Sequence, residues 1–217
     1  MNDVRHHEPS WRVPWRRHPS AFLLAAQLLS LVIFPLLDDS TGGRVVFSAF
    51  GAMVLLLAIW VVIRTPAVNW IAWLIAVPAF VLSILSVTSD SATLLVWSSA
   101  LEALLYFYVA GSLIAYMFSD HRVTTDELFA AGATFTLLAW GFAYAYFVVQ
   151  AVYPDSFTGA LRPGEPRTWL ELLFLSFTTL SATGLGDIVP LSSPARVMVM
   201  LEQFAGVAYI AVVVSRL

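Results

Sequence analysis

Six stretches of this chain are apolar over the length that a membrane-crossing helix requires, which is about 17–25 residues. They run Ala21 to Leu37, Val45 to Ile63, Ala67 to Val87, Ala92 to Phe118, Phe129 to Tyr153 and about Pro194 to Leu217. The composition agrees, because 59% of the 217 residues are hydrophobic and only 12% are charged. Such a balance excludes an ordinary soluble domain. We predict an all-α integral membrane protein with six transmembrane helices.

The distribution of basic residues predicts how these helices are oriented. Residues 1–19 are polar and basic, and Arg64 and Arg122 fall on the same side of the membrane as this segment, with Arg44 as the exception. Basic residues favour the cytoplasmic side. We expect a multi-pass protein of the cell membrane with both termini in the cytoplasm. The net charge of −3 and the absence of cysteine give no support to nucleic-acid binding, disulfides or thiolate metal sites.

A shorter apolar segment precedes the last membrane-length run. Thr168 and Glu171 form a capping-box pattern at the start of a helix predicted from Trp169 to Leu180, which is too short to cross a bilayer. A glycine-bearing loop from Thr179 to Pro190 follows it. Taken alone, the loop could be a tight turn between two helices. Between a half-membrane helix and a full span, it indicates a re-entrant pore loop.

The core of this loop, Thr183-Gly184-Leu185-Gly186-Asp187, resembles the selectivity filter T-V-G-Y-G-D of the tetrameric potassium-channel family. The resemblance implies a homotetramer in which backbone carbonyls of Thr183, Gly184 and Leu185 replace the hydration shell of potassium, the permeant ion, with no other cofactor. It also implies that Gly184 and Gly186 adopt the positive φ that glycine tolerates. Asp187 would form a ring of carboxylates at the outer mouth.

The loop departs from the family pattern at three positions. Ala182 stands where threonine is usual, Thr183 where valine or isoleucine is usual, and Leu185 where tyrosine or phenylalanine is usual. A missing hydroxyl at Ala182 predicts weaker discrimination against sodium, which Ala182→Thr should sharpen if the loop tolerates threonine. Two alternatives stay open: a weakly selective monovalent cation channel, and a non-conducting pore-loop subunit that partners another channel. No nucleophile–base pair or metal constellation suggests an enzyme.

The resemblance divides the chain into three parts. These are a cytoplasmic basic segment (1–19), a four-helix transmembrane region (20–128) and a pore domain (129–217) with outer helix, turret, pore helix, filter and inner helix. The run from Ala92 to Phe118 contains no arginine or lysine, so we expect weak voltage dependence. Its one charged residue, Glu102, marks a functional site or only a hydrogen-bonded contact. No soluble sensor domain follows the inner helix in this chain, which has either a short lower gate or a truncated end.

Two residues of the inner helix are further candidates. Gly206 lies twenty residues beyond Gly186, where the family often carries a flexible glycine, so it is either a gating hinge or a site of close helix packing. Glu202 lies one helical turn before Gly206 on the same face. It could support the filter from behind through a hydrogen bond, or make an ordinary helix–helix contact.

Overall fold

The computed structural model describes residues 19–34, 54, 56–57, 60, 69–89, 91–119, 124–160 and 162–216. Its elements follow the chain in the order α1 (Pro19–Ile33), α3 (Asn69–Ser89), α4 (Ala92–Met117), α5 (Thr125–Val152), β1 (Phe157–Gly159), α6 (Trp169–Leu180), β2 (Ile188–Pro190) and α7 (Ser193–Arg216). The prediction of a helical fold is therefore confirmed for the described residues, apart from one pair of three-residue strands.

Three helices of the described chain, α4, α5 and α7, are long and apolar enough to cross a membrane. They coincide with the predicted spans that begin at Ala92, Phe129 and about Pro194. Helix α1 and the apolar part of α3 are shorter and overlap the first and third predicted spans. Most of the second predicted span, Val45 to Ile63, and the basic segment before Pro19 lie outside the described residues.

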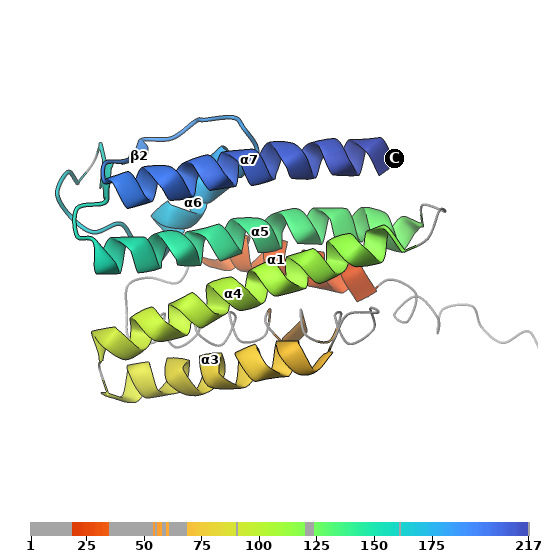
Figure 1. Cartoon of the computed structure of the whole chain (residues 1–217), viewed down its shortest axis with the longest axis horizontal. Coiled ribbons are helices and arrows are strands. Elements are labelled where there is room, and N and C mark those ends of the chain that lie inside the picture. Colours follow the sequence, from red (N-terminus) through yellow and green to blue (C-terminus); the bar gives the residue numbers. More distant parts are fainter. Residues whose placement is uncertain are drawn as a thin grey trace, which may run out of the picture.

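Helix α5 lies at the centre of the bundle and contacts α1, α4, α6 and α7, whereas α3 packs against α4. In Figure 1, α7, α5, α4 and α3 follow one another from top to bottom, and α1 lies behind α5. Small residues line α5 where its neighbours pack, because a short side chain lets two helix backbones approach closely. The fully buried ones are Ala130, Ala133, Ala139 and Ala143.

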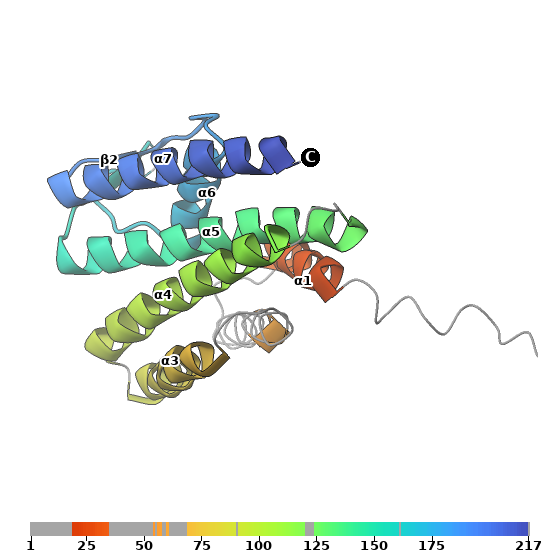
Figure 2. The same cartoon turned by 45° about the vertical axis from the view of Figure 1, so that its right-hand side comes forward.

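Helix α6 is short and lies between α5 and α7, with contacts to both. Figure 2 shows it crossing the space between these two long helices. On either side of α6 the chain forms an antiparallel strand pair, in which Phe157 lies opposite Pro190 and Gly159 opposite Ile188. The pair ties the segment after α5 to the segment before α7. Sequence reasoning did not predict it, since three residues are too few to show an alternating pattern.

Candidate functional site

The capping box at the start of α6 is present in the structure. The Glu171 amide donates to Thr168 Oγ1 at 3.3 Å, and the Thr168 amide donates to Glu171 Oε2 at 2.7 Å. Arg162 donates to Glu171 Oε1 at 3.1 Å. Burial alone would raise the pKa of Glu171, but the hydrogen bonds from Thr168 and the contact with Arg162 outweigh it and hold that pKa below its usual value. The cap is complete while Glu171 is ionised, and it weakens as the pH falls through this lowered pKa.

The segment just before α6 is attached to the last turns of α5. The Arg167 amide donates to Gln150 Oε1 at 2.7 Å, and Gln150 Nε2 donates to the Arg167 carbonyl at 3.0 Å. The Arg167 side chain is buried, lies 3.6 Å from Glu171 Oε1 and donates through Nε to the Glu165 carbonyl at 3.1 Å. These contacts fix the outer end of α6 through side chains that sequence reasoning did not single out.

The other end of α6 leads into the predicted filter through a Schellman motif. The Ala182 amide donates to the Thr179 carbonyl at 3.0 Å, and the Thr183 amide donates to the Thr178 carbonyl at 3.1 Å. This pairing places the residue after the helix cap in the left-handed conformation, and Ala182 accordingly has φ 57°. The Thr178 carbonyl also accepts from the Gly184 amide and from Thr183 Oγ1.

The positive φ values of the filter loop differ from the expected ones. Gly184 has φ 63° as predicted, but Gly186 is not among the positive-φ residues of the described chain. The expectation for Gly186 was wrong, because the left-handed residues that alternate along this loop are Ala182 and Gly184. The Schellman motif accounts for Ala182, because its hydrogen bonds to Thr178 and Thr179 impose a left-handed residue at position 182.

Ala182→Gly should therefore stabilise the protein by about 1 kcal/mol, since alanine is strained at this φ and glycine is not. Ala182→Thr should destabilise it, because a β-branched residue fits the left-handed region poorly. The measurement is thermal unfolding of the purified protein in detergent. Ala115→Gly is the control, because Ala115 is exposed within α4 and glycine there should destabilise by about 1 kcal/mol. If Ala182→Gly lowered the melting temperature as Ala115→Gly does, this account of the loop would be wrong.

The predicted filter residues 182–187 are all exposed in the single chain. Leu185 is 73% exposed, and the Asp187 side chain is open to its surroundings. The chain after them is fixed again, because the Leu191 amide donates to the Ser156 carbonyl at 2.8 Å and the hydroxyls of Ser156 and Ser192 lie 2.8 Å apart. The loop is thus held at both ends and uncovered between them.

Glu202 of α7 is fully buried behind α6. Its carboxylate accepts hydrogen bonds from the Tyr146 hydroxyl of α5 and from the Ser176 hydroxyl of α6. The Ser176 hydroxyl also lies 2.8 Å from the Ala139 carbonyl oxygen of α5. The three helices of the predicted pore domain therefore meet at one buried carboxylate.

Gly206 contacts the last residue of α6. A Cβ atom built on Gly206 would lie 2.1 Å from the Leu180 carbonyl oxygen, far closer than any real contact. Leu180 lies one turn beyond Ser176, and Gly206 lies one turn beyond Glu202. Helices α6 and α7 are therefore joined on two consecutive turns, and the close approach gives the packing interpretation of Gly206 a direct physical basis.

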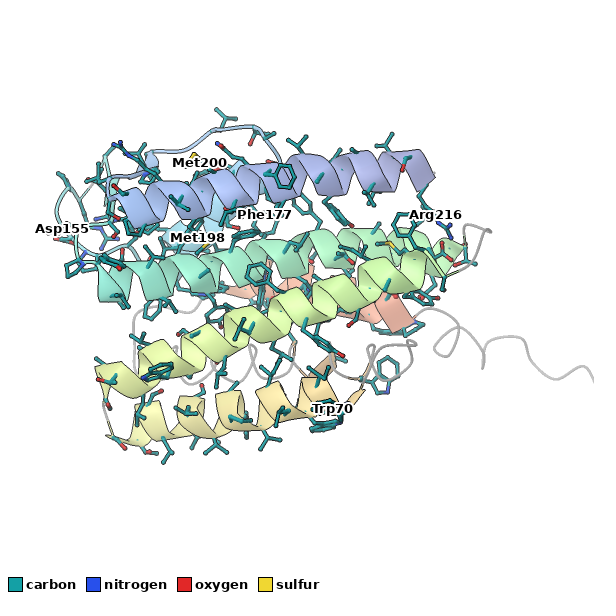
Figure 3. The ribbon with its side chains drawn as sticks, in the orientation of Figure 1. Trp70, Asp155, Phe177, Met198, Met200 and Arg216 are labelled. Atoms are coloured by element: carbon teal, nitrogen blue, oxygen red, sulfur yellow. The ribbon has the colours of Figure 1, made fainter. Side chains whose placement is uncertain are left out.

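The rest of α7 separates into a buried and an exposed face. Its buried residues are Ala195, Glu202, Gly206 and Tyr209. Figure 3 shows Met198 on the side of α7 toward α5 and Met200 on the far side. The far side carries exposed apolar side chains along its length, namely Val197, Met200, Leu201, Phe204, Val207, Ile210 and Val214.

Comparison with known protein families identifies the class of protein to which this chain belongs. A family model described as an ion channel matches residues 103–217, which is more than half of the chain and includes most of α4 and all of α5, α6 and α7. The chain belongs to this family of pore-loop cation channels, and it is a membrane protein. A comparison with curated proteins and one with solved structures each found no match.

Proposed function

We propose that this protein is a potassium-preferring channel whose pore forms on the axis of a homotetramer. The observation that carries the proposal is the exposed loop 182–187, which lies between a short helix and the membrane-length helix α7. Non-helical backbone is tolerated at membrane depth only where it is covered by protein or lines water. Further copies of the chain and a column of water and ions would provide that cover.

The polarity of the loop favours cations. Helix α6 ends at the loop, and the carbonyl end of a helix carries a partial negative charge. The carbonyls of Thr183, Gly184 and Leu185 would coordinate dehydrated potassium, and Asp187 would concentrate cations at the outer mouth. Helix α6 begins at Trp169 and ends at Leu180, so its negative end is the one next to the loop.

Two features of the single chain, its pore loop and the exposed side of α7, support a tetramer. A single loop encloses nothing, so a pore requires several copies around a closed symmetry axis. The apolar far side of α7 is exposed along its length and would line the cavity below the filter and contact neighbouring copies. In this arrangement the chain has six spans with both termini in the cytoplasm, residues 20–128 form the peripheral four-helix region, and residues 129–217 form the pore domain.

The second candidate, a weakly selective monovalent cation channel, is favoured by Ala182 and Leu185. Ala182 offers no hydroxyl to an ion entering from the cavity, and the exposed Leu185 side chain cannot form the hydrogen bonds that a tyrosine would make in its place. Both differences predict a softer filter than in relatives with threonine and tyrosine there. We therefore expect preference for potassium with weaker exclusion of sodium.

The test is ion flux from purified protein in liposomes under opposed potassium and sodium gradients. We expect the reversal potential to be displaced from zero toward the potassium equilibrium potential. The current should vary smoothly with voltage, because α4 has no basic residue. Gly184→Ala should reduce the current, since it adds about 1–2 kcal/mol of strain at a left-handed residue of the filter (φ 63°). Gly111→Ala, in open space on α4, should leave it intact.

Each other outcome has a definite meaning. A reversal potential at zero would replace the proposal with the weakly selective channel. Silence of a correctly assembled native protein would favour the non-conducting subunit. A steep conductance–voltage curve that required several elementary charges would contradict the expected weak voltage dependence.

A further inference from the structure

Arg167 lies just before α6 and carries a buried charge whose contacts reach beyond that helix. Its side chain is only 1% exposed. A guanidinium can be buried at acceptable cost only where its donors are paired. Here Nε and Nη2 donate to the Glu165 carbonyl at 3.1 and 2.5 Å, Nη2 also donates to the Arg162 carbonyl, and Nη1 lies 3.6 Å from Glu171 Oε1. Every nitrogen of the guanidinium therefore has a partner.

The segment that supplies these carbonyls is a turn built around the guanidinium. The Glu165 amide donates to the Arg162 carbonyl at 3.3 Å, and Gly164 has φ 85°. Proline at the second position and a left-handed glycine at the third are typical of a type II turn, and Pro163 and Gly164 occupy these positions. Because the carbonyl that closes the turn also accepts from Arg167, the turn and the guanidinium hold each other in place.

Gly159 of β1 lies against the same guanidinium. A Cβ atom built on Gly159 would lie 2.6 Å from Arg167 Nη1, and the three atoms nearest to it all belong to Arg167. The end of a flexible side chain can usually move aside, but this one is held by its bonds to the turn. Glycine at this position therefore leaves free the space that the guanidinium occupies.

Strand β1 leads from this contact to the outer end of the predicted filter. Gly159 lies opposite Ile188, the first residue of β2, and Ile188 follows Asp187, the last residue of the predicted filter. The same guanidinium pairs with Glu171 in the first turn of α6. One side chain thus contacts the start of the helix before the filter and, through β1, is linked to the strand after it.

We propose that Arg167 is a positioning residue that sets the outer end of the predicted filter relative to the start of α6. It holds β1 at Gly159, the strand pair holds Ile188, and Ile188 fixes the chain next to Asp187. The loop 182–187 is exposed in the single chain, so its outer end has to be fixed by the segments that flank it. The structural part of the inference stands without conduction, whereas its consequence for ion flow rests on the proposed function.

The test is amide hydrogen exchange of the whole chain in lipid nanodiscs. Arg167→Met removes the guanidinium and keeps an unbranched apolar side chain. We expect the amides of Thr158 and Val189, which lie opposite each other in the strand pair, to exchange at least about tenfold faster, because hydrogen bonds from a charged group are lost. The Leu172 amide, which donates to the Thr168 carbonyl at the start of α6, should exchange faster as well.

Gly159→Ala tests the same contact from the strand. The added methyl should displace the guanidinium, so exchange should rise at Thr158 and Val189 and, although the change lies in β1, at Leu172 of α6. In the double variant Gly159→Ala/Arg167→Met the methyl no longer meets the guanidinium, so exchange should be no faster than in Arg167→Met alone. If Arg167→Met does not assemble, native exchange at Leu172 in Gly159→Ala would still overturn the proposal.

Arg162→Met is the matched control. The Arg162 side chain is 48% exposed and contacts the same carboxylate, since its Nη2 lies 3.1 Å from Glu171 Oε1. This variant deletes a surface ion pair but keeps the Arg162 carbonyl that accepts from Arg167. Exchange at Thr158 and Val189 should therefore stay native.

Native exchange at Thr158 and Val189 in Arg167→Met would show that Arg167 acts on α6 alone, and it would overturn the proposal. Equal loosening of the strands by Arg162→Met would do the same, as would additive effects in the double variant, because the methyl would then meet something other than the guanidinium.

Gly159→Ala also tests the consequence for ion flow, because it changes no charge. A displaced Asp187 should concentrate cations less at the outer mouth. Charges act over about 10 Å at 0.1 M salt and about 3 Å at 1 M, so conductance should fall at low potassium and stay near native at high potassium. Native conductance of Gly159→Ala at low potassium would overturn this consequence. The expected exchange pattern without any native current would leave the positioning role standing and contradict the channel function instead.

Discussion

Gly206→Ala is expected to destabilise the protein by about 1–3 kcal/mol, although alanine is normally the better residue within a helix. The added methyl would occupy the position that lies 2.1 Å from the Leu180 carbonyl oxygen. Backbone atoms cannot rotate away as a flexible side chain can, so α7 would have to separate from the end of α6. The filter begins two residues after Leu180, and it would shift with that end.

The measurement is the thermal stability of the assembled protein in detergent, together with open probability in planar bilayers. Gly111→Ala is the matched control, because a Cβ there meets nothing within 4 Å and should stabilise α4 by up to about 1 kcal/mol. If Gly206 acts as a hinge rather than a packing site, Gly206→Ala should change open probability and leave assembly intact. Unchanged stability with altered gating would therefore contradict the expectation from packing.

Glu202→Leu is expected to have an effect of similar size for a different reason. Removing the carboxylate leaves the buried hydroxyl of Tyr146 without its acceptor, whereas the Ser176 hydroxyl keeps the Ala139 carbonyl, and a buried unsatisfied group costs about 1–3 kcal/mol. Glu202→Gln keeps one acceptor oxygen and should be milder. Both effects should appear as a lower unfolding temperature and as looser attachment of α6, seen by faster amide exchange around Ser176.

Tyr146→Phe provides the second side of this test, since it removes one donor and keeps the ring. Tyr153→Phe is its control, because Tyr153 is half-exposed at the end of α5. The effects of Glu202→Leu and Tyr146→Phe should not add fully, because the two side chains share one bond. Additive effects, or an equal loss in Tyr153→Phe, would show that Glu202 makes only an ordinary helix contact.

The elements that the sequence predicted well are those that depend on local patterns. Apolar length predicted α4, α5 and α7, and the capping box with its apolar run predicted the bounds of α6 as the structure has them. The Thr183–Asp187 resemblance predicted the class, which the family match to residues 103–217 confirms. Each of these signals lies within one continuous segment of the chain.

What the sequence did not predict depends on segments that are far apart. Gln150 pairs with Arg167 and Tyr146 with Glu202, and no local sequence pattern in one segment identifies its partner in another. Gln150 and Glu202 were still marked by being polar within apolar runs, which is a usable signal of an internal contact. The failed expectation for Gly186 has another origin, because the resemblance predicted two left-handed glycines, whereas the structure has Ala182 and Gly184 in that conformation.

The attachment of α6 within its own chain has a consequence for biogenesis. Gln150 and Arg167 hold its start, Glu202 holds its middle and Gly206 contacts its end. In the proposed tetramer, a monomer folded as in this structure would already hold the half-membrane helix α6 in place before the copies associate. Between α6 and β2, residues 182–187 form a continuous exposed run in the single chain, so assembly of the proposed tetramer would cover this six-residue loop and the apolar far side of α7 without having to fold a whole domain. Most of the conformational entropy of each chain would then be lost before the copies associate, and association itself would require little further ordering.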